Sequence, residues 1–409
     1  MKPSVLVVAT SQWFPTARFA MALAQAGCNV EAVCPPGHPL RKTKAVRRCH
    51  RYRGLLPLRS LASAIEAARP DLIVSGDDLA TRQLHHLHRS LQNSRDTETR
   101  TMIERSLGSP ESFPVVYQRA SFMQIAESEG VRVPRTAVLA SVAELKSWVE
   151  KAGLPVVLKA DGTSGGDGVR IARTMEEAEE AFFALQAPPM IARALKRSVV
   201  NRDNTLIWPA LLRRRPAISA QTFIPGHEAT SAVACWKGEL LAALHFEVVY
   251  KMYSAGPATV MRMIENADMS SAVEKMVRRL NLSGVHGFDF MLETDSAHAY
   301  LIEINPRTTQ IGHLTLGAGH DLPAALFSAL TGDTIRPAAK LTDNTLITLF
   351  PQEWMRDPSS PYLQSGYLDV PWSEPELLRA CVQRARKQHS LQTQRGWQQY
   401  VAAAEVPRA

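Results

Sequence analysis

Two apolar segments in the second half of the chain carry polar side chains that could hold a metal ion. Asp289 lies within residues 287–292, and Glu303 and Asn305 lie within residues 300–307. If the segments form a hairpin, Glu303 and Asn305 share one strand face, about 7 Å apart, and Asp289 can lie opposite them. Buried carboxylates need a partner, and oxygen ligands suit Mg²⁺ held jointly with phosphates. The alternative is the polar, outward side of a half-exposed sheet.

A glycine-rich stretch over residues 159–169 could bind phosphate. Glycines let backbone N–H groups approach a phosphate chain, and Lys159 at the root of the loop supplies a positive charge. No Gly-Lys-Ser/Thr follows, and the next residues are strand-like, so the stretch is neither a Walker A loop nor a dinucleotide fingerprint. A flap between two antiparallel strands fits it, and a plain hairpin turn is the alternative. The flap residues that would contact nucleotide are Ser164, Gly165, Gly166 and Gly168.

Alternating short apolar runs and helical patterns organise the first hundred residues. This βαβ rhythm predicts a small parallel α/β domain, with Thr16 as the N-cap of its first helix. A polar stretch over residues 93–105 marks a linker or an exposed helix end, so we expect a domain boundary near residue 105. The expected strands are 5–9, 30–34 and 72–75, and the expected helices are 17–26 and 61–68.

The rest of the chain has a mixed α+β pattern. Ser141 with Glu144, and Thr174 with Glu177, form capping-box pairs that open two helices. Strand patterns dominate residues 220–305. The other expected elements are strands 156–159 and 169–172 and helices 271–280 and 373–388.

Composition limits the class of protein. The chain has 409 residues, 45% hydrophobic and 21% charged, which excludes a disordered or fibrous main state. A net charge of +8 suits an anionic partner. The five cysteines are scattered and form no CxxC pair, which favours a reducing cytoplasm. The first apolar run, residues 5–9, is too short for a signal-peptide core or a membrane span.

Together these motifs resemble the ATP-grasp superfamily over roughly residues 115–320. The resemblance implies a two-lobed ATP-grasp fold after the parallel α/β domain. It also implies that Lys159 contacts ATP phosphates beneath the flap, residues 162–168. Residues 119–136 look like the first segment of that fold, and its basic residue, here Arg119 where lysine is more usual, also approaches phosphate. Arginine keeps the charge but changes the donor geometry.

The same resemblance assigns the nucleotide and the metal. Residues 221–228 are similar to the family's hinge strand, so Phe223 and Ile224 would face adenine and Glu228 would bind the ribose. Gln221 stands where glutamate is frequent. The triad Asp289, Glu303 and Asn305 would hold two Mg²⁺ ions that bridge phosphates, with Mn²⁺ as a substitute.

Two arginines are candidates for the reacting end of the substrate. Arg307 resembles the family arginine that stabilises an acyl phosphate or its carboxylate precursor, and Arg262 matches a mobile substrate loop. A guanidinium can hold carboxylate or phosphate with two parallel hydrogen bonds, although either arginine could instead be a surface ion-pair partner. We expect core or surface roles for His286, His298 and His313.

Basic clusters at residues 41–53 and 213–215 suggest solvated loops or, alternatively, contact with an anionic partner. Nucleic-acid binding is favoured by interleaved aromatic residues, and only Tyr52 accompanies the first cluster.

The resulting hypothesis is an ATP-dependent carboxylate-amine ligase. Mg-ATP would activate a carboxylate as an acyl phosphate, and an amine or related nucleophile would attack it, releasing ADP and phosphate. The alternatives are an ATP-grasp phosphotransferase acting on a hydroxyl and a non-catalytic ATP-dependent binding or regulatory protein. The partners would be small molecules rather than membrane or nucleic acid, with the oligomeric state open. The expected division is 1–105 for the α/β domain, 106–219 for the small lobe, 220–335 for the large lobe and 336–409 for a C-terminal tail.

Overall fold

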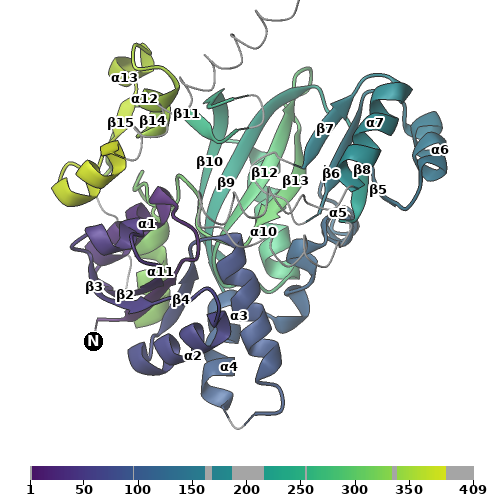
Figure 1. Cartoon of the computed structure of the whole chain (residues 1–409). Coiled ribbons are helices and arrows are strands. Elements are labelled where there is room, and N and C mark those ends of the chain that lie inside the picture. Colours follow the sequence, from purple (N-terminus) through teal and green to yellow (C-terminus); the bar gives the residue numbers. More distant parts are fainter. Residues whose placement is uncertain are drawn as a thin grey trace, which may run out of the picture.

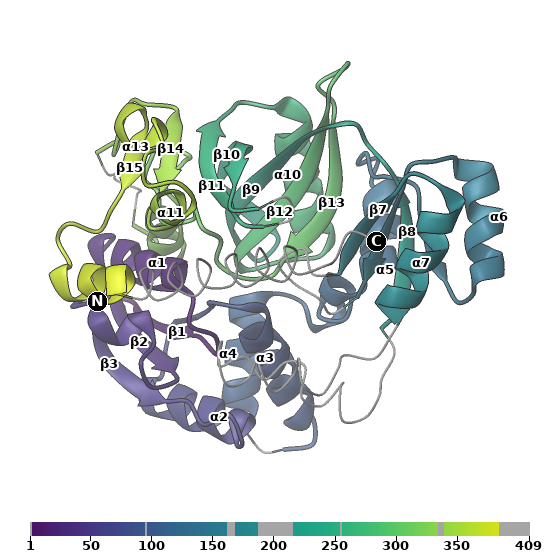
Figure 2. The same ribbon diagram turned by 45° about the horizontal axis from the view of Figure 1, so that its top comes forward.

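The chain folds into an N-terminal α/β domain and two further lobes, each built on its own sheet (Figure 1). The computed structural model describes residues 2–94, 96–161, 168–186, 216–253, 256–333 and 339–383. In Figure 2 the N-terminal domain lies on one side of the large central sheet and the small lobe on the other. Among the described residues no helix combines the length and the apolar character needed to cross a bilayer.

The N-terminal domain is the predicted parallel sheet, in the order β3-β2-β1-β4. Side chains of β1 alternate between two hydrophobic cores: Val5 and Val7 enter one, while Leu6 and Val8 enter the other. Such a strand is apolar at every position because helices cover both faces of the sheet. The strands are β1 (Ser4–Val8), β2 (Asn29–Cys34), β3 (Val46–Arg51) and β4 (Leu72–Ser75), and the helices are α1 (Phe14–Gln25), α2 (Pro57–Ala68), α3 (Asp78–Ser90) and α4 (Thr97–Leu107).

Three local predictions in this domain differ from the structure. Helix α1 begins before Thr16, because Pro15 occupies its first turn, and the Thr16 hydroxyl donates instead to the Gly76 carbonyl at 3.2 Å. The stretch expected as a linker or helix end is mostly α4. The basic cluster at residues 41–53 contains β3, a strand at the edge of the sheet, where a polar sequence is tolerated because less of the strand is covered.

The small lobe is a four-stranded antiparallel sheet in the order β5-β8-β6-β7, with two helices packed in its core. Both predicted capping boxes are confirmed. The Ser141 hydroxyl accepts from the Glu144 N–H at 3.2 Å, the Glu144 carboxylate accepts from the Ala140 N–H at 2.8 Å, and Thr174 with Glu177 repeats the pattern. The elements are β5 (Thr136–Leu139), β6 (Val156–Ala160), β7 (Val169–Ala172), β8 (Ile218–Thr222), α6 (Val142–Ala152) and α7 (Met175–Gln186).

The large lobe is a seven-stranded sheet in the order β13-β12-β9-β10-β11-β14-β15. Helices α5 and α10 share a hydrophobic core with β9, β12 and β13, and α11 packs against β9 and β10. Its strands are β9 (Gly226–Trp236), β10 (Glu239–Lys251), β11 (Ala258–Met263), β12 (Gly284–Glu293), β13 (Ala299–Asn305), β14 (Leu346–Leu349) and β15 (Tyr367–Asp369), and its helices are α5 (Arg119–Ser128), α10 (Ala267–Arg279), α11 (Leu322–Thr331), α12 (Gln352–Arg356) and α13 (Tyr362–Ser365).

The sheets divide the chain differently from the predicted boundaries in two places. Helix α5, expected in the small lobe, packs in the large-lobe core through Phe122 and Met123. Strands β14 and β15, expected in a C-terminal tail, extend the large sheet. A further helix covers residues 375–383, within the predicted 373–388, and the rest of that prediction lies outside the described residues, as does the basic cluster 213–215.

The N-terminal domain and the large lobe share one hydrophobic core. Phe19 of α1, Phe246 of β10 and Leu326 of α11 all belong to it. At the end of α1, Gly27 has a φ of +107°, and a Cβ there would lie 3.0 Å from the Phe327 ring. These contacts hold the N-terminal domain against the large lobe, beside the end of β13, where the candidate site lies.

Candidate active site

The three parts of the molecule meet at a cleft with a volume of about 1060 Å³. The small lobe contributes β6 and β7, the large lobe contributes β9, β12 and β13, and the N-terminal domain contributes the loop after β1 and the start of α3. Ligand sites commonly lie in such clefts between domains and at the carboxyl ends of parallel strands.

The predicted oxygen ligands come together at the β12–β13 hairpin. Asp289 pairs across the strands with Glu303, and the Asn305 amide donates to the Asp289 carboxylate at 2.8 Å. The Thr230 hydroxyl on β9 donates to the other oxygen of Asp289 at 2.8 Å. Burial raises the pKa of Asp289 to about 6, and the neighbouring Glu303 carboxylate acts in the same direction. Two opposed carboxylates with a carboxamide oxygen form a donor set that suits Mg²⁺.

Two cations, the buried Lys159 and the partly buried Arg119, face this carboxylate pair. The guanidinium of Arg119, at the start of α5, contacts Asp161 and Glu303, each at 3.2 Å. Lys159 on β6 is only 6% exposed, and burial lowers its pKa to about 8, with the charge of Arg119 acting in the same direction. The backbone of Ala160 donates to the carbonyl of Gly168 at 2.9 Å, which closes the base of the predicted flap. The other flap residues, including Ser164, Gly165 and Gly166, lie outside the described residues.

The predicted adenine-binding segment connects the two sheets. Strand β8 ends at Thr222, and Phe223 and Ile224 line the cleft before β9 begins. At Gly226 a Cβ would lie 1.9 Å from the Leu292 carbonyl oxygen, so the chain can pass β12 there only without a side chain. This close approach holds the two apolar residues at the mouth of the cleft.

Polar groups flank that segment on both sides. Gln221 is buried and donates to the Thr136 hydroxyl at 3.1 Å. Glu228 lines the cleft and pairs with Lys251 at 2.7 Å. Each therefore has an internal partner in addition to its position beside the nucleotide segment.

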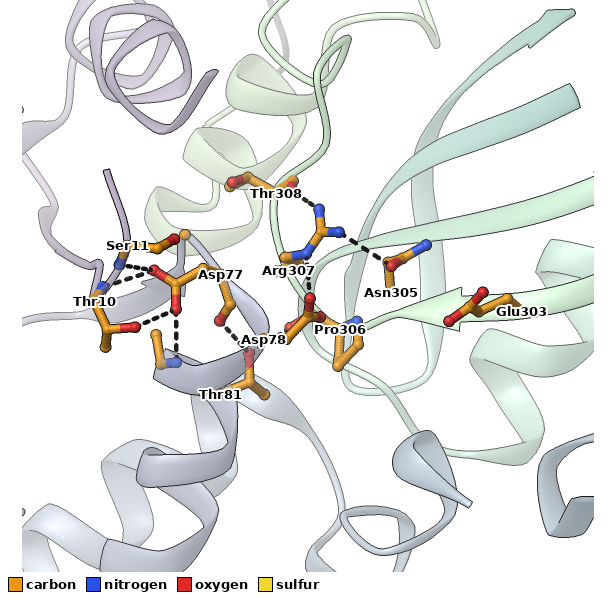
Figure 3. A network of polar contacts seen from close by, with 12 residues as sticks. Thr10, Ser11, Asp77, Asp78, Thr81, Glu303, Asn305, Pro306, Arg307 and Thr308 are labelled. Atoms are coloured by element: carbon orange, nitrogen blue, oxygen red, sulfur yellow. Dashed lines mark hydrogen bonds and ion pairs between the residues drawn. The ribbon is translucent and has the colours of Figure 1, made fainter. Parts of the chain in front are cut away.

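Arg307 lies where β13 meets the N-terminal domain (Figure 3). Its Nε donates to Asp78 on α3 at 3.0 Å, and its two terminal nitrogens donate to Asn305 Oδ1 and the Thr308 carbonyl at 3.2 and 3.1 Å. The guanidinium also lies 4.7 Å from the centre of the Trp13 ring. Although burial alone would lower the pKa of Arg307, the pair with Asp78 outweighs it and raises the pKa. Arg307 is thus a cation held in place two residues after Asn305, the last of the three predicted oxygen ligands.

A buried carboxylate positions the N-terminal side of the site. Asp77 accepts hydrogen bonds from the Thr10 N–H and hydroxyl, both at 2.6 Å, and from the Ser11 and Ala80 N–H groups at 3.0 and 2.9 Å (Figure 3). It caps α3 and ties that helix to the loop after β1. Burial raises the pKa of Asp77, and these hydrogen bonds oppose the shift. Asp77 therefore holds the two loops that flank Arg307 in one arrangement.

One predicted site residue lies away from the others. Arg262 is half-exposed on β11 and forms an ion pair with Glu247 on β10, while its neighbour Met261 lines the cleft. Adjacent residues of a strand point to opposite faces, so Arg262 faces away from the cleft. The prediction of a substrate contact is therefore corrected to its alternative, a surface ion pair.

The predicted structural roles of the histidines are confirmed. His286 is buried, His298 is exposed beside Asp268, and His313 is buried against Asp369 at 2.8 Å.

Sequence reasoning missed most of the N-terminal wall of the cleft, which comprises Ser11, Gln12, Trp13, Asp78 and Arg82. It also missed Tyr117 and Lys251. One signal was available, because residues 11–13 and 77–78 directly follow two parallel strands, whose carboxyl ends commonly carry binding residues.

Comparison with known proteins identifies the family. The sequence model of the carbamoyl-phosphate synthase L chain, ATP-binding domain, matches residues 118–322, half of the 409-residue chain. The chain belongs to this ATP-grasp family. The match begins just before α5 and ends at the start of α11, so it leaves out the N-terminal wall of the cleft together with Val116 and Tyr117.

Relatives in this ATP-grasp family are distant and longer. The N-terminal section of the carbamoyl phosphate synthase large chain from Aquifex aeolicus is 26% identical over 238 residues, 54% of this chain and 36% of that protein. The large chain from Methanosphaerula palustris is 28% identical over 295 residues, 70% of this chain and 24% of that protein. The chain therefore spans only a quarter to about a third of these relatives.

A solved structure supports the same fold. The biotin carboxylase domain of Hydrogenobacter thermophilus 2-oxoglutarate carboxylase, determined with MgADP, ADP and bicarbonate, superposes with a TM-score of 0.57. It is 16% identical in sequence, and the match covers 83% of this chain and 72% of that one. Because the family match covers only half of the chain, this structural similarity extends beyond the matched residues.

Proposed function

We propose that the protein is an ATP-dependent carboxylate-amine ligase. The observation that carries the proposal is the order of charges along one cleft. Lys159 and Arg119 lie beside the flap, the pair Asp289 and Glu303 follows, and Arg307 lies at the N-terminal domain. This order matches a phosphate chain, its metal ions and a reacting carboxylate.

Each described residue has a distinct part in the proposed reaction. Phe223 and Ile224 pack against adenine, and Glu228 accepts from the ribose hydroxyls. Lys159 and Arg119 hold the phosphates and offset the charge that develops on the transferred phosphoryl group. Arg307, fixed by Asp78, orients the substrate carboxylate for in-line attack on the γ-phosphorus.

Asp289, Glu303 and Asn305 would hold Mg²⁺, or Mn²⁺ in its place, because both cations prefer oxygen ligands. When bound, the metal supplies positive charge at the transferring phosphoryl group. The raised pKa of Asp289 fits this assignment, because a carboxylate pair that is costly to ionise alone is stabilised by a cation.

The reaction proceeds in two balanced steps. A carboxylate oxygen forms a bond to the γ-phosphorus as the bond to the β-phosphate oxygen breaks, which gives an acyl phosphate and ADP. An amine then attacks the acyl carbon, loses a proton and expels orthophosphate, leaving an amide-type C–N bond. A cytoplasmic location, where ATP is abundant and the five free cysteines stay reduced, suits this chemistry.

The test is ADP release across a panel of carboxylates, bicarbonate included, and amines with Mg²⁺. We expect turnover that depends on both substrates and produces equimolar ADP and orthophosphate. Glu303→Ala should abolish it, while Glu265→Ala, at a mostly exposed position, should not.

Equal activity in the wild type and Glu303→Ala would contradict the metal assignment. AMP and pyrophosphate would contradict the acyl phosphate. A stable phosphorylated product would instead establish the hydroxyl phosphotransferase.

A further inference from the structure

Arg82 on α3 is a cation in the cleft that the proposed reaction does not use. Its guanidinium lies 4.6 Å from the centre of the Tyr117 ring, and both residues line the cleft. The Nε of Arg82 is buried and has no acceptor in the described part of the chain. Buried donors of this kind nearly always have a partner, so an unpaired one needs an explanation.

The Nε of Arg119 likewise has no acceptor in the described part of the chain, but the guanidinium groups of the other two arginines of this region are engaged by carboxylates. Arg119 contacts two carboxylates, and Arg307 contacts Asp78. Over the described residues, Arg82 forms no ion pair. Burial raises the pKa of Asp161, and the charges of Arg119 and then of Arg82 oppose that shift, but the Asp161 carboxylate is already engaged by Arg119. The guanidinium of Arg82 is therefore available to an anion that enters the cleft.

Aromatic packing holds this guanidinium in place. The Tyr117 ring contacts His85 as well as Arg82, with the His85 ring centre 5.6 Å away in an edge arrangement. His85 in turn stacks on Phe113 with ring centres 3.8 Å apart. A guanidinium stacked on a fixed ring loses little freedom when it binds a carboxylate or phosphate, and it presents two parallel donors.

The position on α3 places Arg82 beside the reacting end of the site. Asp78, which holds Arg307, lies four residues earlier, so the two side chains are neighbours on one face of the helix, about 6 Å apart along its axis. Thr81 on the same side donates to the Pro306 carbonyl at 2.7 Å, which fixes this face against the end of β13 (Figure 3). A molecule that reaches the carbon activated beside Arg307 therefore passes within range of Arg82.

We infer that Arg82, stacked on Tyr117, forms an anion subsite that binds a carboxylate or phosphate monoester on the amine substrate. The inference rests on the proposed function, since it places the acceptor amine at the N-terminal wall. It assigns the acceptor to a chemical class, amines that also carry an anionic group. Arg82 is thus a specificity residue and not part of the phosphoryl-transfer machinery.

Three probes with one amine in common test the subsite: ethanolamine, β-alanine and phosphoethanolamine. Each is titrated by calorimetry into the full chain at constant ionic strength, with saturating Mg²⁺ and a non-hydrolysable ATP analogue. The variants are Arg82→Gln and Arg82→Lys, with Arg89→Gln, at an exposed position on the same helix, as the matched control. Urea unfolding and analogue binding are measured first for every variant.

We expect at least one anionic probe to bind the wild type and Arg89→Gln about tenfold or more tightly than ethanolamine. Arg82→Gln should lose that difference while it binds the ATP analogue normally, and Arg82→Lys should keep part of it, because lysine retains the charge but not the two parallel donors. β-Alanine and phosphoethanolamine separate a carboxylate from a phosphate subsite.

Three results would overturn the inference: equal binding of all three probes by the wild type, no binding of any anionic probe, or unchanged discrimination in Arg82→Gln. If the only effect of Arg82→Gln were weaker binding of the ATP analogue, Arg82 would instead be assigned to the nucleotide. Failure of the wild type to bind the analogue, with probe discrimination intact, would refute the proposed function but not the subsite.

Discussion

The lowered pKa of Lys159 predicts that ATP binding weakens at alkaline pH. Lys159 is buried beside Arg119, and its pKa is about 8 in the unliganded protein. A lysine loses its positive charge as pH rises through its pKa, so one of the two cations proposed to bind phosphate, Lys159, is progressively lost around pH 8 while Arg119 stays charged. The protonated fraction falls from about 0.9 at pH 7 to about 0.1 at pH 9, and the association constant for ATP should fall by up to about tenfold with it.

The assay is fluorescence titration with a mant-labelled ATP at saturating Mg²⁺, repeated from pH 7 to pH 9. Lys159→Arg should flatten the profile, because a guanidinium stays protonated throughout this range. Lys151→Arg, at an exposed position on α6, should keep the wild-type profile. A wild-type profile that is flat between pH 7 and pH 9, or an equally steep profile in Lys159→Arg, would refute the reasoning.

Two further predictions concern other buried charges. Asp289 has a pKa of about 6 and must be ionised to bind a cation, so the Kd for Mn²⁺, measured by EPR, should rise about tenfold from pH 7 to pH 5. Asp289→Asn should bind Mn²⁺ weakly at both pH values. Asp369 pairs with Arg18 and His313 inside the protein. Asp369→Asn should therefore lower the free energy of unfolding, measured in urea at pH 7, by about 3–5 kcal/mol. The control Asp343→Asn, at an exposed position, should lower it by less than about 0.5 kcal/mol. The pKa of Asp369 is lowered to about 2, so this stabilisation is complete above the unfolded-state pKa of roughly 4 and is lost as pH falls toward 2. Equal stability of Asp369→Asn and Asp343→Asn at pH 7 would contradict the prediction.

The three proposed metal ligands, Asp289, Glu303 and Asn305, were predictable because they lie close together in the sequence. Asp289 and Glu303 lie on consecutive strands of a hairpin, and the alternation of side chains places Glu303 and Asn305 on one face wherever that hairpin packs. Lys159 before a glycine-rich loop is equally local. Capping boxes also depend on residues only three apart, and both were found where the sequence placed them.

The failures have a different origin. Arg262 and Met261 are adjacent, and only the pairing of β11 with β10, which contains register shifts after Val248, decides which of them faces the cleft. Strands β14 and β15 are short, at four and three residues, and carry little periodicity to identify them. Strand β14 pairs with the edge of β11, and β15 pairs in turn with β14, so both depend on partners distant in sequence.

The residues proposed for nucleotide and metal were therefore predictable from the sequence, because strand periodicity and short loops set their spacing. Only the tertiary structure decided the end that faces the N-terminal domain. Arg307 meets Asp78 across 229 positions of sequence, and Thr81 meets Pro306 across 225. Such contacts depend on how separately formed elements pack against a shared core, and the periodicity of a sequence carries no information about that packing.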